Sequence, residues 1–526
     1  MSTAAVTERS HEVVPPARLP ARRVNRCIVG LSALTVVAAA VRFVGLAHQS
    51  YWFDEADTVA ILHTSLGGLL ARVPGWETTP PLYFILAWLW VHVFGYGEAG
   101  LRSLSALAGV ITVPVAYAAG AELFSRRVGL IVAALTACNP LLVWYSQEAR
   151  SYALLVLLTS VALLAFAHLR IRPTPRWMVT WAVAAALALA THYYAALAIV
   201  PEGILLLARY RSIRLVRTGV IGIAVCCLPL VLLAIRQLGN LGISSWINRV
   251  PLLQRIGDVP KAFAIGPNAP GGQWLVLASA IAVGISAGLT ARRANRHERR
   301  SILFVARLVA GGFGIVIALI VFKLDQLNTR NMLALWLPVA LVISGGLGVR
   351  RAGAIGPAGA VVLCTVGLAT VIGVAVDPWL QRPAWRSVAR ALRSTAERAV
   401  FTINGCQLLP LSLYVPGLQF APPTGTVVTE IDVIAVANQT SWYDVTFSGW
   451  YTVCRPQRRS VAIPRQLGSF RASGRPVRIN QFSVLRLTSD APVRVTQRMF
   501  SAAGLRGALM VAHGDRSQPT GGSASP

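Results

Sequence analysis

The chain has 526 residues, of which 55% are hydrophobic and only 13% are charged, and its mean hydropathy is +0.59. These values exclude a soluble protein of this length and indicate a polytopic membrane protein. The net charge of +29 could suggest nucleic-acid binding. The arginines fall in short clusters between apolar runs, however, which is the pattern of cytoplasmic loops in membrane proteins, so we expect no nucleic-acid partner.

Apolar runs suited to crossing a bilayer recur over the first three quarters of the chain, although several are short for a hydrocarbon layer of roughly 30 Å. They lie at about 27–47, 81–97, 101–120, 128–144, 152–168, 177–191, 194–208, 216–235, 272–290, 301–322, 331–348 and 353–376. The first run resembles a signal peptide, but Arg42, Phe43 and the bulky residues after them offer no small-residue cleavage site. We therefore predict a basic cytoplasmic tail (1–26) followed by an all-α transmembrane bundle of about 11–13 helices (27–377).

The arginine clusters predict the orientation of these helices. Clusters at 209–217, 291–300 and 349–351, and the one in the N-terminal tail, belong inside the cell. The loop 48–80, the segments 236–270 and 323–330 and everything after Asp377 then lie outside. Twelve crossings would return the C-terminus to the cytoplasm, so one segment between 81 and 208 must be re-entrant, broken or miscounted.

The composition changes after Asp377. Apolar residues at helical spacing predict a helix from Trp385 to Ala399, and short β-rich runs follow at 399–403, 424–436 and 481–489. We predict a small extracytoplasmic α/β domain at 378–511 and a disordered tail at 512–526. Cys406 and Cys454 lie in this domain, in an oxidising compartment, and we expect them to pair. No metal-binding or redox motif is visible among the seven cysteines.

The predicted outer loop contains the most informative stretch, YWFDEADT at 51–58, which places Asp54, Glu55 and Asp57 where the first membrane helix surfaces. Residues 56–72 are predicted to form an amphipathic helix along the membrane surface. Helix capping alone would account for Asp54 and Asp57. It leaves Glu77 unexplained, beside Trp76 and just before the next span. Carboxylates, aromatic rings and arginines at a membrane interface are what sugar transfer from a lipid phosphate needs.

Several segments together resemble one known family. In chain order they are YWFDEA, ETTPPLYFILAWLW, FGYGEAGLRSLSALAG, NPLLVWYSQEARSYALL, THYYA, TRNMLALWLP and PAWRSVARAL. This order resembles the protein O-mannosyltransferase-like branch of the C-type glycosyltransferases, which includes the lipid A aminoarabinose transferases, over roughly residues 27–400.

The resemblance implies an integral-membrane enzyme that moves mannose or a related sugar from a polyprenyl phosphate to a hydroxyl on the outer face, usually with inversion at the anomeric carbon. The acceptor could be a protein, a lipid or a cell-wall glycan. Asp54 would be the general base and Glu55 its catalytic neighbour, although neighbouring helical residues point about 100° apart and so should not act as one dyad. No cofactor is predicted, and a metal is optional. Thr79 departs from the pattern, because many relatives have His or Lys before the proline.

The remaining site candidates each have a structural alternative. The predicted substrate-binding residues are Glu77, Tyr145, Glu148, Arg150, His192, Tyr193 and Arg330. Glu148 and Arg150 could bind the donor or form a structural ion pair. Arg330 could hold the donor phosphate or snorkel to the interface, and His192 could be a packing residue. Arg102 is interpreted as structural, with Glu98 as its partner.

Two other classes of protein remain open at this point. A multi-span lipid or glycolipid transporter or flippase would also be apolar and basic, but it would need polar residues in mid-span and an internal repeat, which the sequence does not show. A non-catalytic scaffold would need no acids in the first outer loop. Sugar transfer is therefore the favoured function, and we expect membrane lipid to surround the protein.

Overall fold

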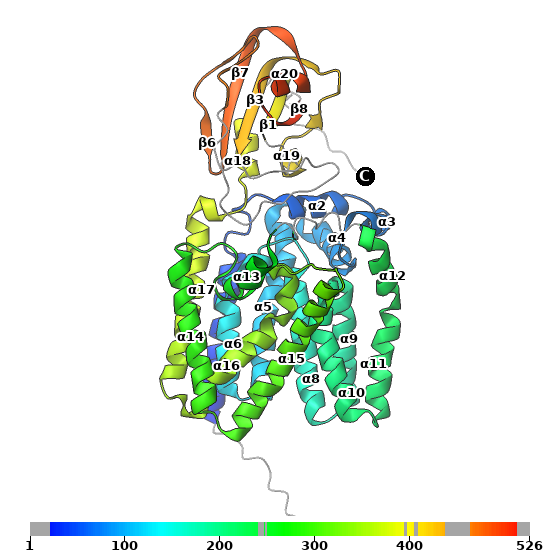
Figure 1. Ribbon diagram of the computed structural model, residues 1–526, viewed down its shortest axis with the longest axis vertical. Helices are drawn as coiled ribbons and strands as arrows, with labels where there is room; N and C mark the ends of the chain where they lie inside the picture. Colours follow the sequence, from blue (N-terminus) through cyan, green and yellow to red (C-terminus); the bar gives the residue numbers. More distant parts are fainter. Residues whose placement is uncertain are drawn as a thin grey trace, which may run out of the picture.

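The computed structural model describes residues 21–239, 247, 250–393, 397–403, 409–436 and 463–512. A helix bundle forms most of the molecule, and a small sheet domain lies on one end of it (Figure 1). We call this end of the bundle the domain end and the opposite one the far end. The predicted fold class, an all-α polytopic bundle with a small C-terminal α/β domain, is confirmed.

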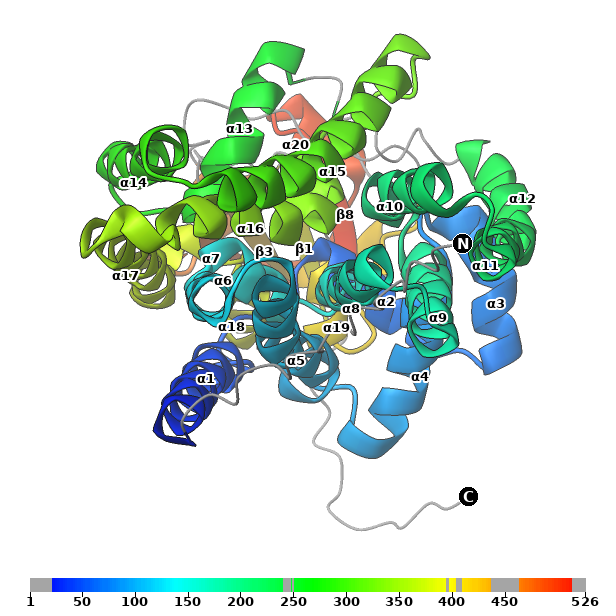
Figure 2. The same cartoon turned by 90° about the horizontal axis from the view of Figure 1, so that it is seen from below.

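The bundle is built from long apolar helices, with shorter helices at its two ends. Its elements are α1 (Ala21–Phe43), α2 (Phe53–Leu62), α3 (Leu66–Trp76), α4 (Leu82–Phe94), α5 (Glu98–Leu123), α6 (Arg126–Cys138), α7 (Pro140–Ser146), α8 (Tyr152–Ile171), α9 (Pro175–Thr191), η1 (Tyr193–Ala195), α10 (Ala196–Tyr210), α11 (Arg214–Cys226), α12 (Leu228–Gln237), α13 (Leu252–Ile265), α14 (Gly272–Arg292), α15 (Arg296–Val321), η4 (Thr329–Leu335), α16 (Trp336–Leu347), η5 (Arg350–Ala352) and α17 (Ile355–Val376). Seen from the far end, α1 lies at one edge and α11 and α12 at another (Figure 2).

The described residues contain eight helices that are long and apolar enough to cross a membrane, or nine if α6 and α7 count as one bent span. Two further apolar helices, α1 from Cys27 and α4, are shorter. The sequence predicted about twelve spans, so some predicted spans do not meet the length that a straight crossing requires. Multiple membrane spans are nevertheless clear from the length and composition of these helices.

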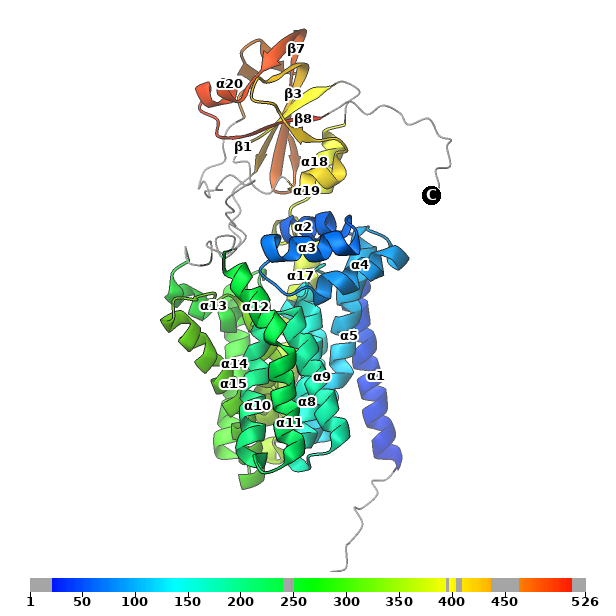
Figure 3. The same ribbon diagram turned by 90° about the vertical axis from the view of Figure 1, so that its right-hand side faces the viewer.

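Helix α4 accounts for the parity problem. It has 13 residues, which gives a length of about 20 Å, well short of a hydrocarbon layer of roughly 30 Å. It lies at the domain end of the bundle and does not run along its length (Figures 1 and 3). The predicted span at 81–97 is therefore the one that does not cross, and its removal leaves an odd number of crossings, as the charge pattern requires.

The basic loops lie together at the far end. Figure 1 shows the connections α10–α11, α14–α15 and α16–α17 at the end of the bundle remote from the sheet domain, and α1 also begins there. These connections carry the arginine clusters 209–217, 291–300 and 349–351. The charge asymmetry read from the sequence is thus a real asymmetry between the two ends of the bundle.

The bend between α6 and α7 depends on a buried arginine. The two helices are bent by 56° at a break before Pro140, which lacks an N–H group and so cannot continue the hydrogen-bond ladder. Arg42 of α1 is fully buried and donates to the carbonyl oxygens of Thr136 and Ala137 at 2.9 and 3.0 Å. These donors satisfy carbonyl groups that would otherwise be unpaired in an apolar environment.

The loop 48–80 contains two helices, where one helix over 56–72 was predicted. Helices α2 and α3 both lie across the domain end (Figures 1 and 3). They are separated by a break at 63–65, after which Ser65 caps α3 by accepting a hydrogen bond from the Gly68 N–H at 3.1 Å. The amphipathic pattern was correct for the surface position, but Ser65 restarts the helix as a side-chain N-cap.

The C-terminal domain is a sheet with helices on both faces. Its elements are η6 (Pro378–Leu380), α18 (Trp385–Ala391), β1 (Arg398–Ile403), α19 (Leu409–Tyr414), β2 (Gln419–Phe420), β3 (Thr426–Val436), β4 (Gln466–Leu467), β5 (Phe470–Ala472), β6 (Val477–Ile479), β7 (Phe482–Val495), α20 (Gln497–Ala502) and β8 (Gly507–Ala512). The strand order is β2-β8-β1-β3-β7-β5-β4, with β6 paired to β7. Helices α18 and α19 cover the face toward the bundle, and α20 covers the other (Figures 1 and 3).

The β-rich runs predicted from the sequence all belong to this sheet, whereas the predicted helix at 385–399 was too long. Helix α18 ends at Ala391, and Ala399 already lies in β1. The reason is that Ala399 and Phe401 are fully buried in a cluster that includes Phe500, so sheet packing overrides the helical spacing. Cys406, Cys454 and residues 513–526 lie outside the described residues.

The C-terminal domain contacts the loop that precedes α2. The hydroxyl of Tyr414 in α19 accepts from the Tyr51 N–H at 2.7 Å and donates to Glu98 Oε1 at 2.6 Å. Arg386 in α18 forms an ion pair with the same Glu98 at 2.8 Å. The predicted pairing of Arg102 with Glu98 is therefore wrong, because Glu98 faces the C-terminal domain while Arg102 faces the bundle interior.

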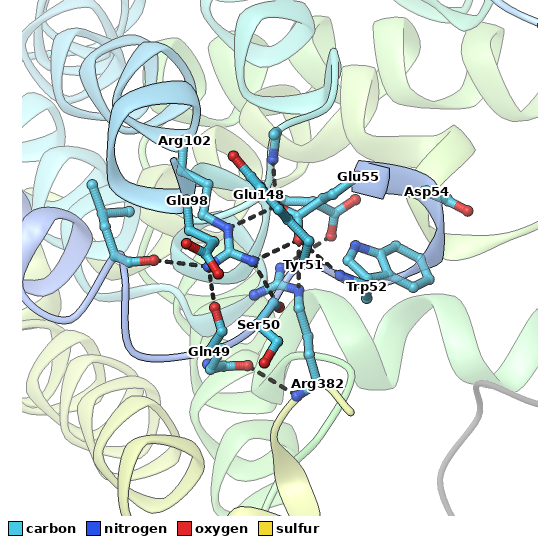
Figure 4. A network of polar contacts seen from close by, with 12 residues as sticks. Gln49, Ser50, Tyr51, Trp52, Asp54, Glu55, Glu98, Arg102, Glu148 and Arg382 are labelled. Carbon is cyan, nitrogen blue, oxygen red and sulfur yellow. Dashed lines mark hydrogen bonds and ion pairs between the residues drawn. The ribbon is translucent and has the colours of Figure 1, made fainter. Parts of the chain in front are cut away.

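Arg102 instead pairs with Glu55 in a buried cluster (Figure 4). Its Nε and Nη2 donate to the two Glu55 oxygens at 2.7 and 2.6 Å. The remaining donors reach the carbonyl oxygens of Leu46, Gln49 and Ser50, so all five N–H groups of the guanidinium are used. Burial alone would raise the pKa of Glu55, but Arg102, together with Arg382 and the Ala149 N–H, outweighs burial and lowers it. The pair fixes the chain between α1 and α2 against α5.

We predict that Arg102→Lys strongly destabilises the protein. Lysine keeps the charge but has three donors in place of a planar fork, and disrupting a buried ion pair of this kind costs about 3 kcal/mol. The exposed Arg300 provides a matched control, because Arg300→Lys should change the free energy of unfolding by less than about 0.5 kcal/mol. Thermal unfolding of the purified proteins in detergent measures both. Equal midpoints for Arg102→Lys and wild type would contradict the structural role of the cluster.

Candidate active site

Asp54 forms an ion pair with Arg330 at the domain end. It lies in the first turn of α2, and its Oδ2 accepts a hydrogen bond from Arg330 Nη1 at 2.8 Å. The two side chains are 11% and 20% exposed, so the pair is partly accessible. Arg330 lies in η4, where Asn328 caps the turn by accepting from the Arg330 N–H at 3.2 Å. Two residues 276 positions apart in the chain are thus brought together.

Glu55, and not Asp54, caps helix α2. Its Oε2 accepts from the Trp52 N–H at 3.3 Å, while its Oε1 accepts from the Ala149 N–H at 2.9 Å. Figure 4 shows the Asp54 side chain pointing away from the cluster around Arg102. Glu55 is fully buried, so its carboxylate holds α2 in place, and the two adjacent acids face different surroundings. Capping is thus not the role of Asp54.

Glu77 and Arg150 form a second buried ion pair. The guanidinium donates to both Glu77 oxygens, at 2.9 and 3.1 Å, and also to Thr58 Oγ1 at 3.2 Å. The Arg150 group also lies over the Phe84 ring. Burial and the Glu77 carboxylate raise the pKa of the nearby Asp57 well above its usual range. Arg150 thus joins Glu77, which the sequence singled out, to helix α2 near Asp54.

Glu148 pairs with Arg382, so of the two alternatives for Glu148 and Arg150 the structural one, an ion pair between them, is wrong. Arg382 follows the last membrane helix, and its Nη2 donates to Glu148 Oε2 at 3.1 Å. Its guanidinium also lies over the Trp144 ring, 4.2 Å from the centroid. Both side chains are buried. No sequence signal pointed to Arg382, because its partner is 234 residues away in the chain.

The aromatic candidates form a group beside these ion pairs. The Tyr145 and Tyr152 rings lie 4.7 Å apart, and Tyr152 lies 5.8 Å from the His192 ring. His192 ends α9 and accepts from the Tyr194 N–H at 3.3 Å. It is buried and packs among aromatic rings, as its structural alternative proposed.

Tyr193 contacts Gln237, a residue that the sequence analysis did not single out. Its hydroxyl donates to Gln237 Oε1 at 2.7 Å, and Gln237 in turn donates to the carbonyl oxygens of Val73 and Thr79. This chain of contacts ties the end of α12 to the segment between α3 and α4, which carries Glu77. Tyr193 therefore positions the Glu77 segment.

The structure thus separates the charged residues of the predicted site into two groups. Asp54 and Arg330 form the accessible pair, with Arg150 and Glu77 directly beside them, since Arg150 Nη1 also reaches the Asp54 carbonyl oxygen at 3.5 Å. Glu55 and Glu148 are fully buried in ion pairs. Within the described residues, no group of three or more His, Cys, Asp or Glu side chains is placed to hold a metal ion.

Glu148 should give the protein's stability a distinctive pH dependence. Burial raises the pKa of Glu148 from 4.5 to about 7, against the opposing effect of Arg382. The folded protein then holds a proton here that the unfolded chain releases, so this contribution is present below about pH 4.5 and is lost as the pH rises through 7. We predict that Glu148→Gln removes a loss on the order of 2 kcal/mol between pH 5 and pH 8. Melting temperatures at both pH values test this, and an unchanged pH slope would contradict it.

Comparison with known protein families gives one match. Residues 78–235 match the family described as dolichyl-phosphate-mannose-protein mannosyltransferase. The matched range includes Tyr145, Glu148, Arg150 and His192, while Asp54 and Arg330 lie outside it. A search of curated protein sequences found no match.

Comparison with solved structures gives distant similarities. ArnT from Cupriavidus metallidurans in the apo state is 15% identical, with a TM-score of 0.49 over 75% of this chain and 85% of that one. The oligosaccharyltransferase of Archaeoglobus fulgidus is 15% identical, with a TM-score of 0.42 over 68% and 54%. The arabinofuranosyltransferase AftD from Mycobacteria is 15% identical, with a TM-score of 0.41 over 90% and 40%. Similarity this low transfers neither a substrate nor a catalytic residue.

The family match falls on segments that the sequence had already singled out, among them NPLLVWYSQEARSYALL and THYYA. These segments form α7, the loop after it and the end of α9, which together surround Arg150. The chain is therefore a multi-span membrane protein that carries, over residues 78–235, the sequence pattern of the dolichyl-phosphate-mannose-protein mannosyltransferases, which confirms the predicted resemblance to the C-type glycosyltransferases.

Proposed function

We propose that the protein transfers a sugar from a polyprenyl-phosphate donor to an acceptor hydroxyl, with Asp54 as the general base. The observation that carries this proposal is the partly accessible Asp54 carboxylate, held by Arg330 at the domain end of a membrane bundle. The family match supports mannose or a related sugar carried on a polyprenyl phosphate. The acceptor class, whether a protein, a lipid or a cell-wall glycan, is left open by this geometry.

The proposed reaction is a single displacement. The acceptor oxygen attacks the anomeric carbon while Asp54 takes the hydroxyl proton, and the bond from that carbon to the phosphate oxygen breaks. The electron pair leaves with the polyprenyl phosphate, so the sugar is inverted at the anomeric carbon. The leaving group is an anion of low basicity and needs no strong general acid. No step in this scheme requires a metal ion.

Arg330 is proposed to exchange Asp54 for the donor phosphate. A guanidinium holds a phosphate through paired hydrogen bonds, as it holds a carboxylate. In the structure Asp54 Oδ2 is engaged by Arg330 and cannot accept a proton freely. Binding of the donor phosphate to Arg330 would release this oxygen for the acceptor hydroxyl. The site would then become active only when the donor is present.

The other predicted residues are assigned supporting roles. Glu55 is fully buried against Arg102, so we propose that it positions Asp54 and does not itself touch substrate. Arg150, held by Glu77, is the second cation near the leaving phosphate. Tyr145 and Tyr152 offer aromatic faces close to this cation.

The distribution of charge supports an extracytoplasmic site. The arginine-rich connections lie at the far end of the bundle, and positive loops are retained in the cytoplasm. The domain end, with Asp54 and the C-terminal domain, would then face outward, where polyprenyl-phosphate sugars serve as donors for this class of enzyme.

The direct test of the function is transfer by membranes that contain the protein. Membranes incubated with a panel of labelled polyprenyl-phosphate sugars should release polyprenyl phosphate and form a labelled product with at least one donor. Membranes containing Asp54→Asn should form no product above background. Absence of transfer from every donor would contradict the proposal.

Asp54→Asn should separate catalysis from folding and donor binding. The amide cannot take a proton, so we predict a loss of roughly two to four orders of magnitude in rate. Expression and melting temperature should stay close to wild type, and donor affinity should not fall, because the neutral amide competes less with the donor phosphate for Arg330 than the carboxylate does. Asp490→Asn, at an exposed site in the C-terminal domain, is the matched control and should keep full activity. Near-normal transfer by Asp54→Asn would remove Asp54 from the mechanism.

Substitutions of Arg330 should lower the affinity for the donor in steps. Arg330→Lys keeps the charge but loses the fork, so its affinity for the polyprenyl-phosphate donor should fall between wild type and Arg330→Ala. The rate should fall in the same order, because the contact exists with both the donor and the leaving phosphate. Equilibrium binding of labelled donor to the three proteins measures this. Equal affinities would make Arg330 an interface anchor and would move the phosphate contact to Arg150.

A further inference from the structure

A cavity of about 620 Å³ lies between the bundle and the C-terminal domain. Its walls come from the loop 47–50 after α1, the end of α17 and the helix α18. The Asp54–Arg330 pair does not line it, and Figure 4 shows Asp54 pointing away from Arg382, which does. The cavity is therefore distinct from the candidate active site, and the proposed sugar transfer gives it no role.

The lining of this cavity is basic. Arg382, Arg386 and Arg390 line it, and none of its lining residues is an acid. Glu148 and Glu98 pair with the first two arginines from outside the cavity. The Nε atoms of Arg382 and Arg386 are buried and do not face the cavity, and Arg382 Nε lies 4.0 Å from Glu55 Oε2.

Arg390 adds a cation that the surrounding protein does not neutralise. Its side chain is exposed, and within the described part of the chain no ion pair is found for it. Ser50, Ser387 and Asn480 add polar groups to the same walls. The Arg390 guanidinium and these polar groups thus give the cavity hydrogen-bond donors and a net positive charge, which suit an anionic group.

An apolar groove of about 340 Å³ continues from this cavity. The two share His48, Gln49 and Ala375. The groove runs between α1, α7 and α17, and its walls are mostly aliphatic, with Val41, Val143 and Ile372 among them. These helices belong to the membrane bundle, so the groove lies where acyl chains of the surrounding bilayer can enter.

From these two features we propose that the protein binds an anionic phospholipid between the bundle and the C-terminal domain, with the phosphate in the basic cavity and an acyl chain in the groove. The basic cavity matches the negative charge of the head group, and the apolar groove matches the acyl chain. Bilayer lipid is favoured over a soluble phosphate, because a soluble ligand would leave the adjoining groove without a function.

The bound lipid would act as a positioning ligand. Arg382 contacts Gln49 and Glu148, and Arg386 contacts Ser50 and Glu98. A phosphate held by Arg386 and Arg390 would therefore steady α18, which contacts the loop that leads into α2 through Arg386. Since this loop is fixed by Arg102, the lipid would stabilise the segment that carries Asp54 without touching the reacting atoms.

The test uses the full-length protein in nanodiscs of phosphatidylcholine that contain small amounts of fluorescent phosphatidylglycerol. Wild type should bind the labelled lipid saturably, and unlabelled phosphatidylglycerol should compete while phosphatidylcholine should not. Arg390→Glu reverses the unpaired charge and Ala375→Trp fills the junction of cavity and groove. Each should weaken binding roughly tenfold or more. Arg393→Glu, an exposed arginine just beyond α18 that does not line the cavity, is the matched control and should bind as wild type.

Four outcomes would overturn the proposal. One is an absence of saturable binding, and another is equal binding by all four proteins. The third is an equal loss with Arg390→Glu and Arg393→Glu, which would indicate general attraction to an anionic surface. Competition by glycerol phosphate as strong as by phosphatidylglycerol would replace the lipid with a soluble phosphate ligand. Melting temperatures of the variants without added lipid separate a lost ligand from a lost fold, and donor-sugar transfer is not used as the readout.

Discussion

The ion pair between Glu55 and Arg102 is the interaction on which the geometry of the site depends. Both charges are buried. Two donors of the Arg102 guanidinium bind Glu55 and the others bind backbone carbonyl oxygens, which fixes the loop before α2 against α5. Because successive residues on a helix point about 100° apart, holding Glu55 inward directs Asp54 toward another side. That side contains Arg330. A buried pair of this kind adds little net stability by itself but is costly to break, and its effect here is to give one helix a single orientation.

The few acids of this chain are concentrated at the domain end. Only 20 of 526 residues are acidic. In addition to Asp54–Arg330, four arginine–acid pairs lie in this region. They are Glu55–Arg102, Glu77–Arg150, Glu98–Arg386 and Glu148–Arg382. Three of them are buried, and a buried charge without a partner would strongly destabilise the folded protein. The Asp54–Arg330 pair is partly accessible, as the Glu98–Arg386 pair is, so its partners can exchange for substrate groups at lower cost than those of the three buried pairs.

Much of this arrangement could be predicted from the sequence, and the failures have identifiable physical causes. Hydropathy and charge gave the bundle, the C-terminal sheet domain and the asymmetry of its ends, because these depend on sums over many residues. The short helix α4 was misread as a span, since an apolar run does not by itself show that the helix is long enough to cross or that it lies along the bundle. Asp54, Glu77, Arg150 and Arg330 were correctly grouped near one surface. The partner expected for Arg102 was wrong, and so was the structural alternative for Glu148, because ion pairs between distant segments leave no local signal. Arg42, Arg382 and Gln237 were missed for the same reason.

The central claim is that Arg330 holds Asp54 until the donor phosphate replaces it. An experimental structure of the protein with and without a bound polyprenyl phosphate tests this most directly. Without the lipid, Arg330 should contact Asp54 as it does here. With the lipid bound, Arg330 should contact the phosphate, and the Asp54 carboxylate should be free while Glu55 and Arg102 stay paired. A bound phosphate that leaves the Asp54–Arg330 pair intact, or that lies away from both residues, would contradict the account.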